Sequence, residues 1–350
     1  MRRFLTTGLA AASIWLTIAV PASACGGLVG ANGSINLLRT ATLAGYHQGV
    51  EHYVTSFEFA GGGAEFGSIV PLPGVPSDVK RGGRWTLQRL QQEVAPPVFE
   101  AADTATAGRA LALQGAEVLM EKEIEALDIT ILKGGADEVG VWARDNGFQL
   151  PPDSPEVLDF YASRSPIFMA ARFDLQRARE LDQGIGDGTP IHVVIPTPNP
   201  WVPLRILGLG RQPNEVIEAD VFLLTDNAPN LLPGPGVGAA EGITIDRSQS
   251  ASETLLADLR SDKGMSWLPE SGMHLTYMKI DSKAKDLVHD LAIDATGNGI
   301  PSRIAAGLKT STPVWPTPSS VPMLLWVGVA ALGLLVIGGL VRGTTMRWPT

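Results

Sequence analysis

The sequence predicts an α+β fold, with strand-rich antiparallel sheets and a few short helices, followed by one C-terminal transmembrane helix. Stretches in which apolar and polar residues alternate recur between residues 39 and 280, and a period of two is typical of half-buried strands. Only short stretches between them space apolar residues as a helix does. Residues 321–341 carry no charge, and as a helix they would span about 31 Å, the thickness of a hydrocarbon core.

The composition excludes several classes of protein. Of the 350 residues, 45% are hydrophobic and 18% charged, which is too apolar for a disordered chain. The net charge of −9 argues against a nucleic-acid partner, because phosphates require a basic face. A single cysteine can form neither an intramolecular disulfide nor a thiolate metal site. We therefore expect a folded core that packing stabilises.

The N-terminus predicts export. Residues 1–24 begin with Arg2 and Arg3, continue with an apolar run and end in an Ala-x-Ala pattern, which is typical of a cleaved signal peptide. A spanning helix is the other interpretation, but the run is short and polar residues interrupt it. Cleavage after Ala24 would make Cys25 the first residue of the mature chain.

The C-terminus predicts attachment to the cell membrane. Residues 310–320 are uncharged and rich in proline, which indicates an extended stalk. The apolar segment 321–341 follows as a single transmembrane helix. Arg342 and Arg347 lie in the tail 342–350, so the positive-inside rule places the tail in the cytoplasm and the bulk of the chain outside it.

The exported part lies between these ends. Residues 25–227 are expected to form an extracytoplasmic α+β domain, and 243–309 its remainder. The Gly- and Pro-rich stretch 228–242 between them is predicted to be a long loop or a linker. Without the two ends the net charge is more negative than that of the whole chain.

The strands follow from the alternating pattern. Residues 39–46 and 51–59 predict a hairpin around Gln48-Gly49 with one buried face. Residues 66–70 predict a strand that the following prolines end, because proline cannot donate to a ladder. Further strands are expected at residues 118–124, 127–132, 167–175, 191–195, 204–207, 216–225 and 273–280.

The helices are expected at residues 85–94, 136–146, 175–181 and 252–260, with another that opens at Ser154. Ser154-Pro155 predicts a serine cap followed by proline at the first helical position.

His47 and His52 are weak candidates for metal ligands. The segment from His47 to His52 resembles the helices of zinc peptidases, but its spacing is one residue longer and Gly49 lies at a predicted turn. The two rings could approach each other across the hairpin and hold zinc. Structural or surface histidines are the alternative, and the other histidines are isolated in the sequence.

Asp294 and Asn298 are the second pair of weak metal candidates. Residues 294–301 partly resemble a calcium loop, but the twelfth position is Ala305 where a bidentate Glu belongs. A Gly-rich turn explains the same residues. We expect no metal and no cofactor from these patterns.

Cys25 is the remaining site of interest, with three interpretations. It could be lipidated, although Ala22 stands where a lipidation signal prefers Leu. It could be an N-terminal nucleophile with its own amine as the base. It could also be an ordinary free thiol. The chain has no Gly-x-Ser-x-Gly elbow, no phosphate loop and no Gly-x-Gly-x-x-Gly opening a helix.

Three parts of the sequence carry a family resemblance: Ala24-Cys25-Gly26-Gly27, residues 55–59 with 66–76, and Leu150-Pro151-Pro152. In them the chain resembles a family of exported bacterial proteins, domain of unknown function 2330, and the resemblance covers most of residues 25–300. That family has no established activity, so the resemblance implies no catalytic or binding residue. Members often carry a second cysteine soon after the first, which this chain lacks, so no disulfide is implied at the mature N-terminus.

The sequence thus predicts a membrane-anchored extracytoplasmic protein of unknown biochemical function, acting as a non-enzymatic binding or scaffolding domain at the cell envelope. Its expected partners are the membrane and an envelope protein or ligand. An envelope hydrolase that uses Cys25 or a His/carboxylate site is one alternative. An accessory subunit of an integral membrane complex is another.

Overall fold

The computed structural model describes residues 39–57, 66–95, 117–183, 188–234 and 241–308, and the backbone of three short strands before them. These residues belong to one compact unit, which extends to Leu308. Cys25, the predicted stalk, the predicted transmembrane helix and the tail lie outside the described residues, as does the predicted signal peptide apart from Ala22 and Ser23. Within the described residues no helix is both long and apolar enough to cross a membrane.

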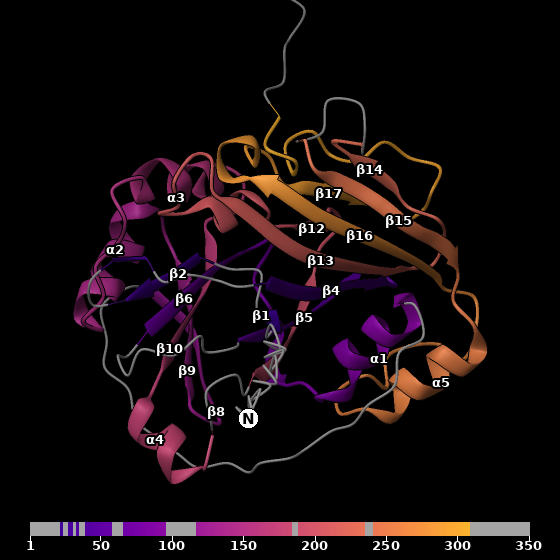
Figure 1. The fold of residues 1–350 in the computed structure, drawn as a ribbon, viewed down its shortest axis with the longest axis horizontal. Coiled ribbons are helices and arrows are strands. Elements are labelled where there is room, and N and C mark those ends of the chain that lie inside the picture. The colour runs from indigo at the N-terminus through magenta and orange to yellow at the C-terminus, as the bar shows by residue number, and fades with distance from the viewer. Residues whose placement is uncertain are drawn as a thin grey trace, which may run out of the picture. The chain divides into compact units, whose positions relative to one another are not determined.

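The largest sheet contains the first hairpin at its centre (Figure 1). The strand β4 (Arg39–His47) pairs with β5 (Val50–Phe57) on one side and, in parallel, with β13 (Val216–Thr225) on the other. The sheet continues outward from these strands through antiparallel neighbours. They are β16 (His274–Lys283) and β15 (Ile243–Ser250) beyond β13, and β11 (Thr189–Pro196) and β7 (Asp78–Arg81) beyond β5. The short β1 (Ala22–Ser23) lies off this path and pairs in parallel with β4.

A second sheet is antiparallel throughout its described strands, in the order β3-β2-β6-β10-β9-β8. These are β3 (Gly33–Ser34), β2 (Gly27–Gly30), β6 (Phe66–Leu72), β10 (Ile167–Phe173), β9 (Leu127–Lys133) and β8 (Glu117–Ile124). A small third sheet joins β12 (Trp201–Val202), β17 (Leu291–Asp294) and β14 (Asn230–Leu232).

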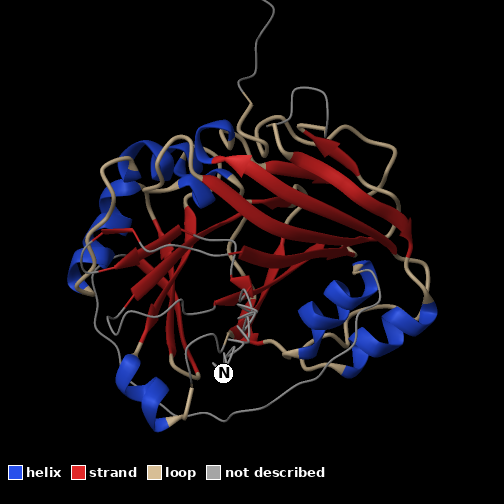
Figure 2. Ribbon diagram, in the orientation of Figure 1, coloured by secondary structure: helices blue, strands red, loops and turns tan. Residues whose placement is uncertain are grey.

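The helices lie outside the sheets (Figure 2). Two of them, α1 (Trp85–Val94) and α5 (Glu253–Ser261), pack against each other and cover one face of the largest sheet. A second pair, α2 (Ala136–Asp145) and α3 (Ser154–Ala162), packs beside the second sheet. The remaining helices are α4 (Leu175–Glu180) and the 3₁₀ turns η1 (Arg205–Gly208) and η2 (Ala284–Asp286). The α+β prediction with antiparallel sheets and few helices is therefore confirmed.

Both faces of the central hairpin are buried. Tyr53 and Val193 belong to the core shared with the second sheet, whereas Val54 and Leu43 belong to the core under α1 and α5. The expectation of a single buried face is wrong. The expectation was wrong because His52, a polar residue on the second face, suggested contact with water, whereas its side chain is only 8% exposed.

Three local predictions also differ from the structure, and several strands were not predicted. Residues 205–208 form the 3₁₀ turn η1 and not a strand, because a short apolar run does not distinguish the two. Ser154 is the first helical residue, and Asp153 occupies the cap position. β6 continues through Pro71 to Leu72, beyond the last residue that pairs with β2, where a strand with one partner tolerates proline. The strand β15 was not predicted, because its residues are nearly all exposed and polar.

A buried carboxylate connects the C-terminal part of the domain. Asp290 is fully buried and accepts hydrogen bonds from the hydroxyl of Tyr161 (2.8 Å) and from the backbone N–H groups of Leu204 (2.8 Å) and Arg205 (3.0 Å). Arg164 forms an ion pair with it at 2.6 Å. The Arg164 guanidinium also lies over the ring of Phe160, 4.1 Å from its centroid, and donates to the carbonyl of Ala305.

We expect Asp290→Ala to lower the free energy of unfolding by about 3–5 kcal/mol, since it leaves a buried guanidinium and several donors without an acceptor. Denaturant unfolding measures this change. Glu156→Ala is the matched control, because it removes the ion pair of a carboxylate that is 79% exposed. The control should lose less than about 1 kcal/mol. Equal losses in the two variants would contradict the role of Asp290.

Candidate functional site

Two histidines from adjacent strands of the largest sheet form a buried pair. His52 lies on β5 and His192 on β11, on the face that α1 and α5 cover. Nδ1 of His52 and Nε2 of His192 are hydrogen-bonded at 2.9 Å. His192 is fully buried, so this contact is closed to bulk water on the side of β11.

Trp267 covers the His52 side of the pair. It comes from the loop between α5 and β16, and its ring stacks on His52 with centroids 3.8 Å apart and an interplanar angle of 4°. Gly45, the cross-strand partner of His52, makes this possible, since a Cβ there would lie 2.4 Å from Cη2 of Trp267. A glycine at this position lets the indole lie flat on the sheet.

Burial keeps both imidazoles neutral. It lowers the pKa of His52 to about 3, helped by the nearby His192, Lys80 and His47. Burial, with Lys80, likewise lowers the pKa of His192 to about 3, and the backbone of Gly264 opposes the shift. In a neutral pair one ring donates its N–H to the bare nitrogen of the other. Such a pair could relay a proton. The described residues contain no cluster of three or more His, Cys, Asp or Glu side chains able to hold a metal ion.

The proposed zinc candidates His47 and His52 have different partners. Nδ1 of His47 hydrogen-bonds to Oδ1 of Asp226 at 2.6 Å, whereas His52 bonds to His192. Trp267 contacts both rings, with its centroid 6.5 Å from that of His47. The structure thus gathers the two histidines around one indole.

The calcium candidates Asp294 and Asn298 lie in a tight turn. The Asp294 carboxylate accepts from the hydroxyl of Thr296 (2.8 Å) and from the N–H of Gly299 (2.7 Å). Partial burial raises the pKa of Asp294, but these hydrogen bonds outweigh it and lower the pKa overall. The N–H of Asn298 donates to the Thr296 hydroxyl at 3.3 Å. The turn's own donors therefore engage the oxygens that a cation would use.

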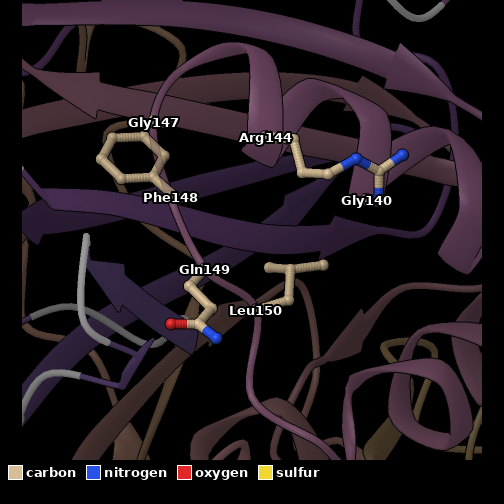
Figure 3. A pocket seen from close by; sticks show the side chains of 6 residues that line it. All are labelled: Gly140, Arg144, Gly147, Phe148, Gln149 and Leu150. Atoms are coloured by element: carbon tan, nitrogen blue, oxygen red, sulfur yellow. The ribbon is translucent and has the colours of Figure 1, made fainter.

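A second candidate site is a groove beside α2 (Figure 3). Its volume is about 530 Å³, within the range of small-ligand sites. Gly147, with φ of +79°, reverses the chain after α2 so that the next residues return along the helix. The described lining residues are Gly140 and Arg144 on α2, followed by Gly147, Phe148, Gln149 and Leu150.

Polar groups flank an apolar side chain in this groove. Figure 3 shows the guanidinium of Arg144 and the amide of Gln149 on either side of Leu150. In the described part of the chain no carboxylate forms an ion pair with Arg144, which is exposed. A Cβ at Gly140 would make only ordinary van der Waals contacts with Arg144 (3.5 Å) and Leu150 (3.9 Å). The groove suits an anionic group attached to an apolar one.

Sequence reasoning missed two further polar sites. The hydroxyl of Ser248 and Nε2 of His274 are hydrogen-bonded at 2.9 Å across β15 and β16, like a nucleophile and its base. Among the described residues no carboxylate hydrogen-bonds to His274, so the orienting group of a triad is missing. The second site is Glu51 on β5, which is fully buried with no described side chain hydrogen-bonded to it. Burial raises the pKa of Glu51 to about 8.

A family model described as "Uncharacterized protein conserved in bacteria (DUF2330)" matches residues 19–227. The chain belongs to the DUF2330 family. The resemblance drawn from the sequence is thereby confirmed, and the match includes the first hairpin, both histidines of the buried pair and the groove beside α2.

Other comparisons say little about this DUF2330 protein. No curated protein matches it. A mutated baculovirus P35 after caspase cleavage is 8% identical with a TM-score of 0.36, covering 73% of this chain and 99% of that one. Baculovirus P35 in its caspase-8 complex is 7% identical with a TM-score of 0.38, covering 73% and 96%. Likenesses at these TM-scores do not establish a shared fold.

The buried histidine pair predicts a loss of stability in acid. Because the pKa of each ring falls from 6.5 in the unfolded chain to about 3 in the fold, their contribution is complete above pH 6.5 and is lost as the pH falls toward 3. For each ring that gains a proton on unfolding, the unfolding free energy falls by about 1.4 kcal/mol per unit decrease in pH. His192→Gln should reduce the slope of unfolding free energy against pH between 6.5 and 4.5, measured by denaturant unfolding. An unchanged slope would mean that the pair does not titrate in this way.

For Glu51 we expect the unfolding free energy to depend on pH in the opposite direction. Its pKa rises from 4.5 in the unfolded chain to about 8 in the fold, so its contribution is complete below pH 4.5 and is lost as the pH rises through 8. The unfolding free energy should fall by about 1.4 kcal/mol per pH unit in that interval. Glu51→Gln should remove this fall and raise the melting temperature at pH 8 more than at pH 5. A variant that is less stable at pH 8 would show that the buried carboxylate is stabilised there.

Proposed function

We propose that this DUF2330 protein is a non-enzymatic binding domain, anchored in the cell membrane with its bulk outside the cytoplasm, that holds an envelope partner in the groove beside α2. The observation that best supports binding is the exposed guanidinium of Arg144, which lacks a carboxylate among the described residues and borders an apolar groove. An arginine in this position is suited to bind a carboxylate by two parallel hydrogen bonds.

The groove favours a partner of particular chemistry. Leu150 provides an apolar surface, and the Gln149 amide can both donate and accept hydrogen bonds. In an envelope protein, an acidic side chain or a C-terminal carboxylate could bind Arg144 and Gln149, and an adjacent apolar residue could pack on Leu150. The attachment rests on the sequence of residues 310–341, and the export on residues 1–24.

An envelope hydrolase is the second candidate. The 2.6 Å hydrogen bond between His47 and Asp226 supports it, because a carboxylate orients the imidazole of a general base in this way. In the described residues no Ser or Thr hydroxyl hydrogen-bonds to His47. Asp226→Asn should leave hydrolysis of a broad panel of ester and amide substrates unchanged if the protein is a binding domain, and a loss of hydrolysis would favour the enzyme.

Crosslinking in the membrane tests the binding function. A photoreactive amino acid in place of Gln149, in the full-length chain, should yield one discrete crosslinked adduct, because Gln149 lines the groove. The same probe at the exposed Arg179 on α4 is the positional control. Arg144→Glu should abolish the adduct by repelling the anionic group, and Arg144→Lys should retain part of it. No adduct at position 149, or one that Arg144→Glu leaves intact, would overturn the proposal.

A further inference from the structure

The last described residues expose large apolar side chains to an unusual extent. Ile300 is 89% exposed and Ile304 is 59% exposed, the two highest values among the large hydrophobic residues of the described chain. Val288 adds a third apolar side chain at 46%. Such side chains are individually common on surfaces, but three of them in neighbouring segments indicate a surface for contact with an apolar partner.

A backbone hydrogen bond joins the segments of Val288 and Ile304, and Ile300 comes four residues before Ile304 in the chain. The N–H of Asp290 donates to the carbonyl of Ala306 at 3.1 Å, so the residues around Val288 run beside the turn that contains Ile304. Exposed basic side chains lie in the same stretches, with Lys285 before Val288 and Arg303 before Ile304. We call Val288, Ile300 and Ile304 the C-terminal apolar patch.

The turn that carries the patch is held firmly. The N–H of Ala306 donates to Ser302 (3.0 Å) and that of Gly307 to Ile304 (2.9 Å). Ala305 and Ala306 are buried in the core next to α3. Gly307 fits against the ring of Phe160, where a Cβ would lie 2.2 Å from Cζ. The buried alanines fix the orientation of the turn, and the isoleucines consequently face away from the core.

The position of the patch along the chain indicates what covers it. The described chain ends at Leu308, and the predicted stalk 310–320 leads to the predicted transmembrane helix at 321–341. An extended polyproline stalk of this length is about 34 Å long, at roughly 3.1 Å per residue. In the anchored protein proposed above, this tether would keep the patch at a high effective concentration relative to the bilayer, so that even a weak contact would persist.

We propose that the C-terminal apolar patch rests on the lipid surface of the membrane that anchors the chain, with Ile300 and Ile304 entering the interface and Lys285 facing anionic headgroups. This contact rests on the membrane attachment in the proposed function. A second copy of the chain is a poorer occupant, because a stable protein interface uses about 20–30 residues a side and the patch has three apolar side chains. The contact would set the orientation in which the domain is held at the membrane.

Depth-dependent quenching of a fluorophore tests the contact. The full-length chain, with Cys25→Ser and Ile304→Cys, is labelled with an environment-sensitive dye and reconstituted into vesicles of phosphatidylethanolamine and phosphatidylglycerol. The label should shift to the blue and be quenched several-fold more by spin-labelled lipids than the same label at Arg179→Cys. Residue 179 lies on α4, away from the C-terminal segment (Figure 1).

A second labelled variant isolates the patch. With the dye at Val288→Cys, the double substitution Ile300→Ser and Ile304→Ser should remove most of the quenching, and circular dichroism should stay unchanged because both side chains are exposed. Equal, water-like emission at residues 304 and 179 in a chain that floats with the vesicles would overturn the patch contact and leave the anchor intact. A chain that does not float would overturn both. A blue shift without lipid quenching, together with a doubled mass, would identify a second copy as the occupant.

Discussion

The buried carboxylate of Asp290 is the constraint on which the C-terminal part of the domain depends. The Asp290 carboxylate accepts hydrogen bonds from the Tyr161 hydroxyl on α3 and from two backbone N–H groups at the start of η1. It also forms an ion pair with Arg164. A carboxylate without these donors would be too costly to bury, and the donors without the carboxylate would be equally costly. These segments therefore stabilise one another through the same carboxylate. Because α2 packs on α3, the groove is held by the same arrangement, and so is the turn that carries Ile304.

Local pattern predicts most of the elements correctly. α1 spans Trp85–Val94 as the helical spacing indicates, and the hairpin of β4 and β5 turns at Gln48-Gly49. The pattern does not reveal that other parts of the chain cover the second face of β5. His52 alternates with apolar residues as a surface residue would, and the residues that cover it, His192 and Trp267, lie 140 or more residues further along the chain. Alternation therefore identified the strand but not how many of its faces are covered.

The candidate sites were less predictable for the same reason. His52 and His192 are separated by 140 residues, and no spacing in the sequence connects them. The groove forms where Gly147 reverses the chain after α2, and its polar residues Arg144 and Gln149 belong to no motif. His47, His52, Asp294 and Asn298 were chosen by their proximity in sequence, and the structure gives each of them hydrogen bonds to other protein groups. Sites built from distant segments need the register of the strands before they can be recognised.

The parallel pairing of β4 with β13 has a consequence for the folding of this chain. β4 ends at His47 and β13 begins only at Val216, so the centre of the largest sheet closes a very long loop, whose entropy must be lost before the contact forms. Until residues 216–283 have been synthesised, the early hairpin has no partner on that side and exposes an open strand edge. The N-terminal part of the chain therefore cannot reach its final structure first. A nascent chain of this kind stays incompletely folded for most of its synthesis.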